Sequence, residues 1–149
     1  MPVKIQASKH DQGFTLIEII AVIIIIGIIA AVAVPKFFAM TDEARAAALD
    51  GALSEAVARF NHAYTKFIVD QKRAPTGIAE LHSAQYLGTN AGLEGTGESI
   101  GDFNVTWRAH AEDANAIVIY IESAESIPEL DSLDANLRQK ELSGIVWNV

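Results

Sequence analysis

The chain has 149 residues, half of them apolar, no cysteine, and a formal net charge of −8 at pH 7. The lack of cysteine excludes disulfides and a thiol nucleophile, and the acidic charge disfavours nonspecific binding to nucleic acid or anionic membranes. Neither Gly-x-Ser-x-Gly nor His-Glu-x-x-His occurs, so the motifs of serine hydrolases and zinc proteases are missing. The sequence therefore predicts no catalytic residue, no cofactor and no metal site.

The leader, residues 1–13, carries Lys4, Lys9 and Asp11 and lies before any apolar run. A secretory signal peptide has its apolar region ahead of the cleavage point, whereas here the apolar region follows the leader. The leader is therefore not an ordinary removable signal peptide. Its positive charges predict that this end of the chain is cytoplasmic.

Residues 14–34 form an apolar run in which only Thr15 and Glu18 are polar. A helix of this length, at about 1.5 Å per residue, covers the ~30 Å hydrocarbon core of a bilayer. A carboxylate inside that core costs on the order of 2–3 kcal/mol, which makes Glu18 a functional candidate. A second interpretation stays open, in which Glu18 reaches the polar interface from its place near the end of the run.

The sequence GFTLIE at residues 13–18 lies between a short basic leader and an Ile/Val/Ala run that ends at Pro35. This pattern resembles the type IV pilin family, which includes the pseudopilins of type II secretion. The resemblance implies that a prepilin peptidase cleaves between Gly13 and Phe14 and N-methylates the new amino terminus. It also implies that Glu18 neutralises the amino terminus of a neighbouring subunit during filament assembly. The segment PKFFAMTDEAR, which starts at Pro35, is similar to pilins of the mannose-sensitive haemagglutinin kind.

Physical chemistry agrees with a charge pair between Phe14 and Glu18. An amine and a carboxylate are each costly alone in lipid, but together they neutralise each other. Their i, i+4 spacing also permits contact within one subunit, and both geometries stay open. Farther along, Gly27 costs about 1 kcal/mol relative to alanine and Pro35 cannot donate a helical hydrogen bond. These two residues predict a segment that can unwind during assembly, although both residue types are common in membrane helices.

The helix is expected to continue past the apolar run to about residue 70. Apolar side chains recur there with helical spacing, at Leu49, Leu53, Ala56, Val57, Phe60, Tyr64, Phe67 and Ile68. The opposite face is polar and carries Glu55 and Arg59 at the favourable i, i+4 spacing. A second, short helix is expected at residues 78–86.

A loop is predicted at residues 88–101 because five glycines occur there. Its nearby acids, Glu94, Glu98 and Asp102, could bind Ca²⁺ through carboxylate oxygens. The spacing of an EF-hand is missing, so a solvated loop is the favoured interpretation.

Alternating apolar residues predict antiparallel strands at residues 103–108 and 116–122, joined by a turn. Pro128 can open a further helix, which would end near Lys140 with basic residues in its last turn. Residues 145–149 are expected to form the last strand and to close the sheet by packing, in place of a disulfide.

The predicted fold class is α+β, a pilin fold in which a long N-terminal helix packs on a small antiparallel sheet of three or four strands. The predicted domains are a leader at residues 1–13, the transmembrane half of the helix at 14–34, and an extracytoplasmic globular domain at 35–149. That domain includes the amphipathic half of the helix.

The predicted function is that of a structural subunit in a type IV pilus-like filament. The expected precursor crosses the inner membrane once, is cleaved and methylated by prepilin peptidase, and assembles with copies of itself through an inner-membrane platform. The assembled filament would lie in the periplasm or outside the cell. Two alternatives stay open: the major pseudopilin of a type II secretion system that drives protein export, and a monomeric, membrane-anchored binding or catalytic domain.

Scattered basic side chains do not point to another function. His62, His82 and His110 are interpreted as surface histidines, and the Lys66, Lys72 and Arg73 group as a solvated helix end. With the acidic charge of the whole chain, nucleic acid is not expected as a partner.

Overall fold

The computed structural model describes residues 13–125, 127, 130 and 135–148. In chain order its elements are α1 (Leu16–Gln71), η1 (Ile78–Leu81), β1 (Glu98–Ile100), β2 (Phe103–Ala109), β3 (Ile117–Ala124), η3 (Ala135–Leu137) and β4 (Gln139–Leu142). The elements η1 and η3 are short 3-10 helices. The chain divides into two compact units, Met1–Thr41 and Asp42–Val149, and α1 passes through both.

Helix α1 confirms the prediction of one helix from the apolar run to about residue 70. It starts directly after Thr15, whose hydroxyl oxygen accepts the backbone N–H of Glu18 at 3.4 Å. Such a cap satisfies one of the N–H groups that the first helical turn leaves without a partner. The helix ends at Gln71, because the next residue, Lys72, adopts a left-handed φ of 57°. A left-handed residue directly after the last turn is a common helix stop.

In the first unit, α1 exposes its apolar side chains. Ile23, Ile26 and Val32 are 62%, 58% and 73% exposed. No residue is buried in the most apolar 18-residue stretch of the helix. Among the described residues, α1 is the helix that is long and apolar enough to cross a membrane. It continues through Gly27 and Pro35, so neither residue ends it. The ability of this segment to unwind stays a prediction.

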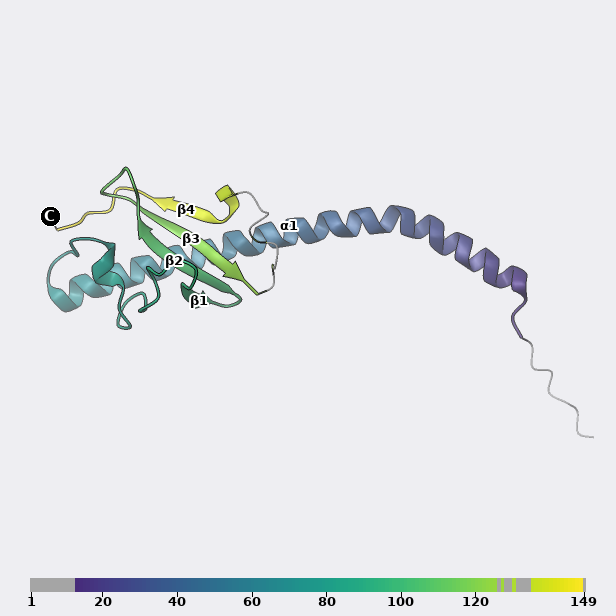
Figure 1. The fold of residues 1–149 in the computed structure, drawn as a ribbon, viewed down its shortest axis with the longest axis horizontal. Helices are drawn as coiled ribbons and strands as arrows, with labels where there is room; N and C mark the ends of the chain where they lie inside the picture. Colours follow the sequence, from purple (N-terminus) through teal and green to yellow (C-terminus); the bar gives the residue numbers. More distant parts are fainter. Residues whose placement is uncertain (1–12, 126, 128–129, 131–134, 149) are drawn as a thin grey trace, which may run out of the picture. The chain divides into compact units, whose positions relative to one another are not determined.

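Strands β1 to β4 form one antiparallel sheet in the order β1-β2-β3-β4 (Figure 1). Strands β2 and β3 confirm the predicted strands at residues 103–108 and 116–122 and their antiparallel pairing. Strand β1 lies inside the segment predicted as a glycine-rich loop. It forms there because Gly101, with a φ of 59°, begins a two-residue turn that returns the chain along β2. Glycine with positive φ at this first turn position is typical of a type II′ hairpin.

The core lies between the second half of α1 and the inner face of the sheet (Figure 1). The buried helix residues are Leu49, Ala52, Leu53, Ala56, Phe60, Ala63 and Phe67, which follow the predicted apolar stripe. Trp107 of β2 is fully buried, and its indole N–H donates to the Ala56 carbonyl at 3.1 Å. The bond links sheet and helix directly. The predicted α+β architecture, a long helix on a small antiparallel sheet, is confirmed.

The outer face of β2 departs from simple alternation, since Thr106 is fully buried as well. Its hydroxyl donates to Oε1 of Glu122 at 2.6 Å, and Arg108 donates to the same carboxylate oxygen. The other oxygen accepts the backbone N–H of Gly95 at 3.0 Å. Glu122 therefore fixes part of the glycine-rich loop against the sheet, where the sequence predicts a solvated loop.

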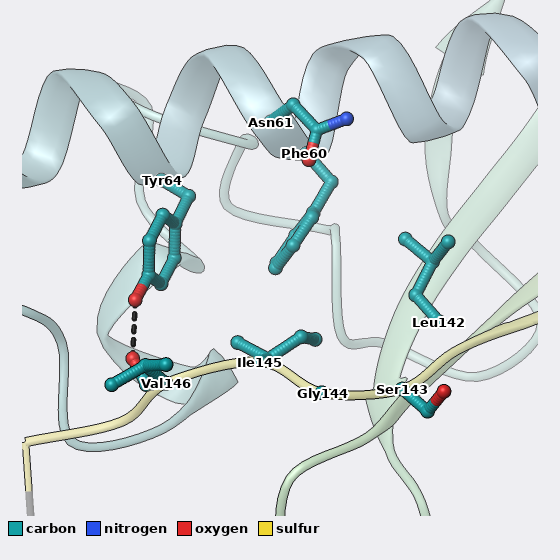
Figure 2. A pocket seen from close by; sticks show the side chains of 8 residues that line it. All are labelled: Phe60, Asn61, Tyr64, Leu142, Ser143, Gly144, Ile145 and Val146. Carbon is teal, nitrogen blue, oxygen red and sulfur yellow. Dashed lines mark hydrogen bonds between the residues drawn. The ribbon is translucent and has the colours of Figure 1, made fainter.

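The predicted strand at residues 145–149 is wrong for its described part, 145–148. Strand β4 pairs with β3 instead, and Gly144, with a φ of 72°, then redirects the chain. Figure 2 shows the following residues beside α1, where the Tyr64 hydroxyl donates to the Val146 carbonyl. The Ile145 N–H donates to a carbonyl of the β2–β3 turn at 2.8 Å. Because these backbone groups find partners outside the ladder, the segment is held without becoming a strand.

Both short predicted helices differ from the structure. In the range 78–86, only Ile78–Leu81 is helical, as the single 3-10 turn of η1, and turns follow it. The helix predicted from Pro128 begins in residues outside the described part of the chain. Its predicted end near Lys140 is wrong, because Lys140 lies in β4 and pairs with Ile119.

Candidate functional site at the N-terminal segment

The peptide bond at the predicted cleavage point lies outside the helix. Gly13, Phe14 and Thr15 have no regular secondary structure, and the Phe14 side chain is 85% exposed. The Thr15 carbonyl accepts the N–H of Ile19 at 3.3 Å, at the start of the helical hydrogen bonds. Within the described part of the chain, no backbone N–H donates to the Gly13 carbonyl. The bond between Gly13 and Phe14 is therefore not engaged in helical hydrogen bonding.

Thr15 and Glu18 bind each other reciprocally at the start of α1. The Thr15 backbone N–H and hydroxyl both donate to Oε2 of Glu18 at 2.7 Å, and the Glu18 N–H approaches the Thr15 hydroxyl oxygen at 3.4 Å. This is a capping box, with Thr15 as the N-cap and Glu18 as the third helical residue. The carboxylate also lies at the end of the helix where the macrodipole favours negative charge.

The capping box gives Glu18 a partner within its own chain, which the sequence interpretation missed. The signal is readable, because the Thr-x-x-Glu spacing ahead of an apolar run is the pattern of a capping box. In the unprocessed chain the Phe14 nitrogen is an uncharged amide, so the pair between Phe14 and Glu18 requires cleavage and stays a prediction.

The sequence around this site matches known proteins. The Prokaryotic N-terminal methylation motif matches residues 8–34. The type IV narrow pilus major component PilA5 of Thermus thermophilus is 45% identical over 65 residues, which cover 44% of this chain and 53% of that relative. The N-terminal segment is therefore similar to that of a type IV pilin. This chain spans about half the length of that relative. No solved structure matches this chain.

Acidic side chains near the glycine-rich loop are engaged in contacts within the second unit, Asp42–Val149. Oε1 of Glu98 accepts the Asn90 N–H at 2.7 Å, and a Glu94 oxygen lies 3.9 Å from the Arg108 guanidinium. Within residues 13–125, 127, 130 and 135–148, no three His, Cys, Asp or Glu side chains gather for a metal ion.

The structure corrects the interpretation of His82 as a surface residue. His82 is half-buried, and its Nε2 lies 2.9 Å from the Trp107 carbonyl. Burial lowers the pKa of the His82 imidazole, and the hydrogen bond to the carbonyl opposes that effect. His110 lies at the β2–β3 turn, where its Nδ1 accepts the Asp113 N–H at 3.0 Å.

The basic group at the end of α1, formed by Lys66, Lys72 and Arg73, is largely paired. Lys66 lies 3.4 Å from Asp70, and the Arg73 guanidinium donates two hydrogen bonds to Glu80, at 2.7 and 2.9 Å. Hydrogen bonds from Arg73, and after them one from a backbone N–H, lower the pKa of Glu80 to about 2. Lys66 and Arg73 thus each pair with a carboxylate near the end of the helix.

A hollow of about 340 Å³ lies between α1 and the residues that follow β4 (Figure 2). Its lining is Phe60, Asn61, Tyr64, Leu142, Ser143, Gly144, Ile145 and Val146. These side chains include no carboxylate, histidine or cation, so the hollow offers no pair for general acid–base catalysis.

Proposed function

We propose that this chain is a structural subunit of a type IV pilus-like filament, made as a precursor in the inner membrane. The observation that carries the proposal is the exposed apolar half of α1, which lies within the methylation motif at residues 8–34 and contains one carboxylate, Glu18. An apolar surface of this extent requires a bilayer or copies of itself as its environment. The relative from Thermus thermophilus is named as a pilus major component, which favours a pilus over a secretion pseudopilus.

In this proposal the leader lies in the cytoplasm and residues 35–149 lie outside the membrane. Prepilin peptidase cleaves between Gly13 and Phe14 and N-methylates Phe14. An inner-membrane platform then moves the subunit into a filament of identical copies. Gly27 and Pro35 allow the helix to unwind locally as the subunit leaves the bilayer.

Assembly requires that the Glu18 carboxylate change its partner. In the precursor this carboxylate accepts two hydrogen bonds from Thr15. After cleavage it pairs with the charged amine of Phe14 on a neighbouring subunit. The attraction between the two charges grows as the local dielectric falls, so the pair is favoured where helices exclude water.

The variant Glu18→Gln tests this role, because glutamine can keep the capping box but has no charge. We expect this precursor to be inserted and cleaved, yet to be missing from filaments sheared off cells that carry the peptidase and the platform. The matched control is Glu43→Gln, which removes an exposed carboxylate beyond the apolar run and should leave filament yield unchanged.

Normal filament yield from Glu18→Gln would contradict the charge-pair role. A chain that is processed but stays a membrane-anchored monomer, under conditions in which the wild-type platform is active, would favour the binding-domain alternative.

A further inference from the structure

The capping box of Thr15 and Glu18 determines where α1 begins. Both side chains are exposed, so the box is held by its own three hydrogen bonds and not by packing against the rest of the chain. It starts the helix at Leu16 and leaves the Gly13–Phe14 peptide outside. The cap and this peptide also line one open hollow of about 520 Å³, formed by Gly13, Phe14, Thr15 and Glu18.

We propose that Thr15 is a positioning residue for cleavage of the leader. By capping the helix together with Glu18, it keeps the Gly13–Phe14 peptide in a non-helical conformation that the peptidase can bind. This inference rests on the proposed function, since it concerns the processing step of the same precursor. Hydrolysis breaks the bond between the Gly13 carbonyl carbon and the Phe14 nitrogen. Water supplies the hydroxyl of the new Gly13 carboxyl group and the proton of the new Phe14 amine.

The physical reason lies in what replaces a lost cap. Without the Thr15 hydroxyl, the next side chain toward the N-terminus that can cap a helix is Asp11. A helix starting after Asp11 would include the Gly13–Phe14 peptide and would direct the Gly13 carbonyl to the N–H of Ile17. The peptidase would then have to break helical hydrogen bonds before it could reach the carbonyl carbon.

Three variants separate positioning from charge pairing. Thr15→Val keeps the β-branched shape but removes the hydroxyl, whereas Thr15→Ser keeps the hydroxyl. Glu18→Gln can keep the box and lacks the charge. The assay incubates each full-length precursor, inserted in detergent micelles, with purified prepilin peptidase and measures kcat and KM for loss of the leader.

We expect Thr15→Val to lower kcat/KM about fivefold, the change in helix-start equilibrium typical of losing a threonine cap. Thr15→Ser should restore cleavage to about the wild-type rate, because serine caps helices as well as threonine does. Glu18→Gln should be cleaved at about the wild-type rate, because glutamine also completes the box.

Amide hydrogen exchange gives a readout that does not depend on the peptidase. In Thr15→Val the Ile17 N–H should become protected, because it gains the Gly13 carbonyl as an acceptor; in the wild type and in Thr15→Ser it should exchange freely. A Thr15→Val precursor with wild-type kcat/KM, or with an unprotected Ile17 N–H, overturns the inference and leaves the proposed function intact. Normal filaments from Glu18→Gln overturn the charge pair and leave the cleavage result of Thr15→Val to decide the inference.

Discussion

Substituting Trp107 with phenylalanine tests how the sheet is attached to α1. Trp107 is completely buried, and its indole N–H donates to the Ala56 carbonyl at 3.1 Å. The variant loses that hydrogen bond, a net contribution of about 1 kcal/mol. It also loses apolar contact from the missing part of the indole ring, for which roughly 40 Å² at 25 cal/mol per Å² gives about 1 kcal/mol. Incomplete collapse around the smaller ring adds a cavity cost, so the free energy of unfolding should fall by about 2–3 kcal/mol.

The measurement is urea unfolding of the full-length chain in nonionic detergent, followed by the fluorescence of the remaining tryptophan. With a urea slope of about 1.5 kcal/mol per M for a domain of this size, the midpoint should fall by about 1.3–2 M. The matched control is Trp147→Phe, because Trp147 is only partly buried, in a T-shaped ring contact with Tyr64, and this substitution should cost clearly less. A midpoint shift for Trp107→Phe no larger than that of Trp147→Phe would refute the assignment of Trp107 as the anchor between sheet and helix.

Three further predictions concern the second unit, Asp42–Val149. Because Glu80 has a pKa of about 2 in the folded state, against an ordinary 4.5, it stabilises the fold above pH 4.5, and this contribution is lost as the pH falls from 4.5 toward 2. Glu80→Gln should weaken the pH dependence of the free energy of unfolding between pH 4.5 and 2. An unchanged pH dependence would exclude the Arg73–Glu80 pair as the cause of this loss of stability. Burial lowers the pKa of His82 in the folded state, so this side chain binds a proton more readily in the unfolded chain. The free energy of unfolding should therefore fall as the pH drops below 6.5. His82→Gln should weaken that dependence in thermal unfolding between pH 7.5 and 5.5; equal slopes in variant and wild type would count against it. Gly97 has a φ of 65°, and a Cβ added there would lie 2.8 Å from the backbone of a strand. Gly97→Ala should therefore lower the midpoint of thermal unfolding by several degrees. Gly95→Ala should lower it less, because the space around Gly95 is open.

Much of the fold could be predicted because its signals are local. Strands β2 and β3 follow from alternation, in which every second residue, such as Val105 and Trp107, is buried. The helical stripe of α1 follows from spacing in the same way. Thr106 shows the limit of this reasoning, because a polar residue on the outer face is buried only where a distant carboxylate, Glu122, accepts its hydroxyl.

The C-terminal residues show why other elements could not be predicted. The run at 145–148 is rich in strand-forming residues, and β-propensity depends strongly on which neighbours are available. In the structure, the place beside β3 is taken by Gln139–Leu142, a segment with little apolar alternation. Tyr64 and the β2–β3 turn supply the partners that hold the later residues against α1.

The candidate site was located from sequence because its features are consecutive. The leader, the predicted cleavage point, the carboxylate and the apolar run all lie within the first 34 residues, and the resemblance to type IV pilins implies their roles. The hydrogen bonds of Thr15 to Glu18 became visible only in the structure, although the spacing of the two residues predicts them.

The sequence by itself determined the long apolar helix, the position of the methylation motif and the two central strands, because each depends on residues that are neighbours along the chain. Tertiary structure alone decided which segment closes the sheet, how Glu122 holds the glycine-rich loop, and that His82 is half-buried beside the Trp107 carbonyl. These features depend on hydrogen bonds and packing between residues far apart in sequence, and local propensity carries no information about such partners.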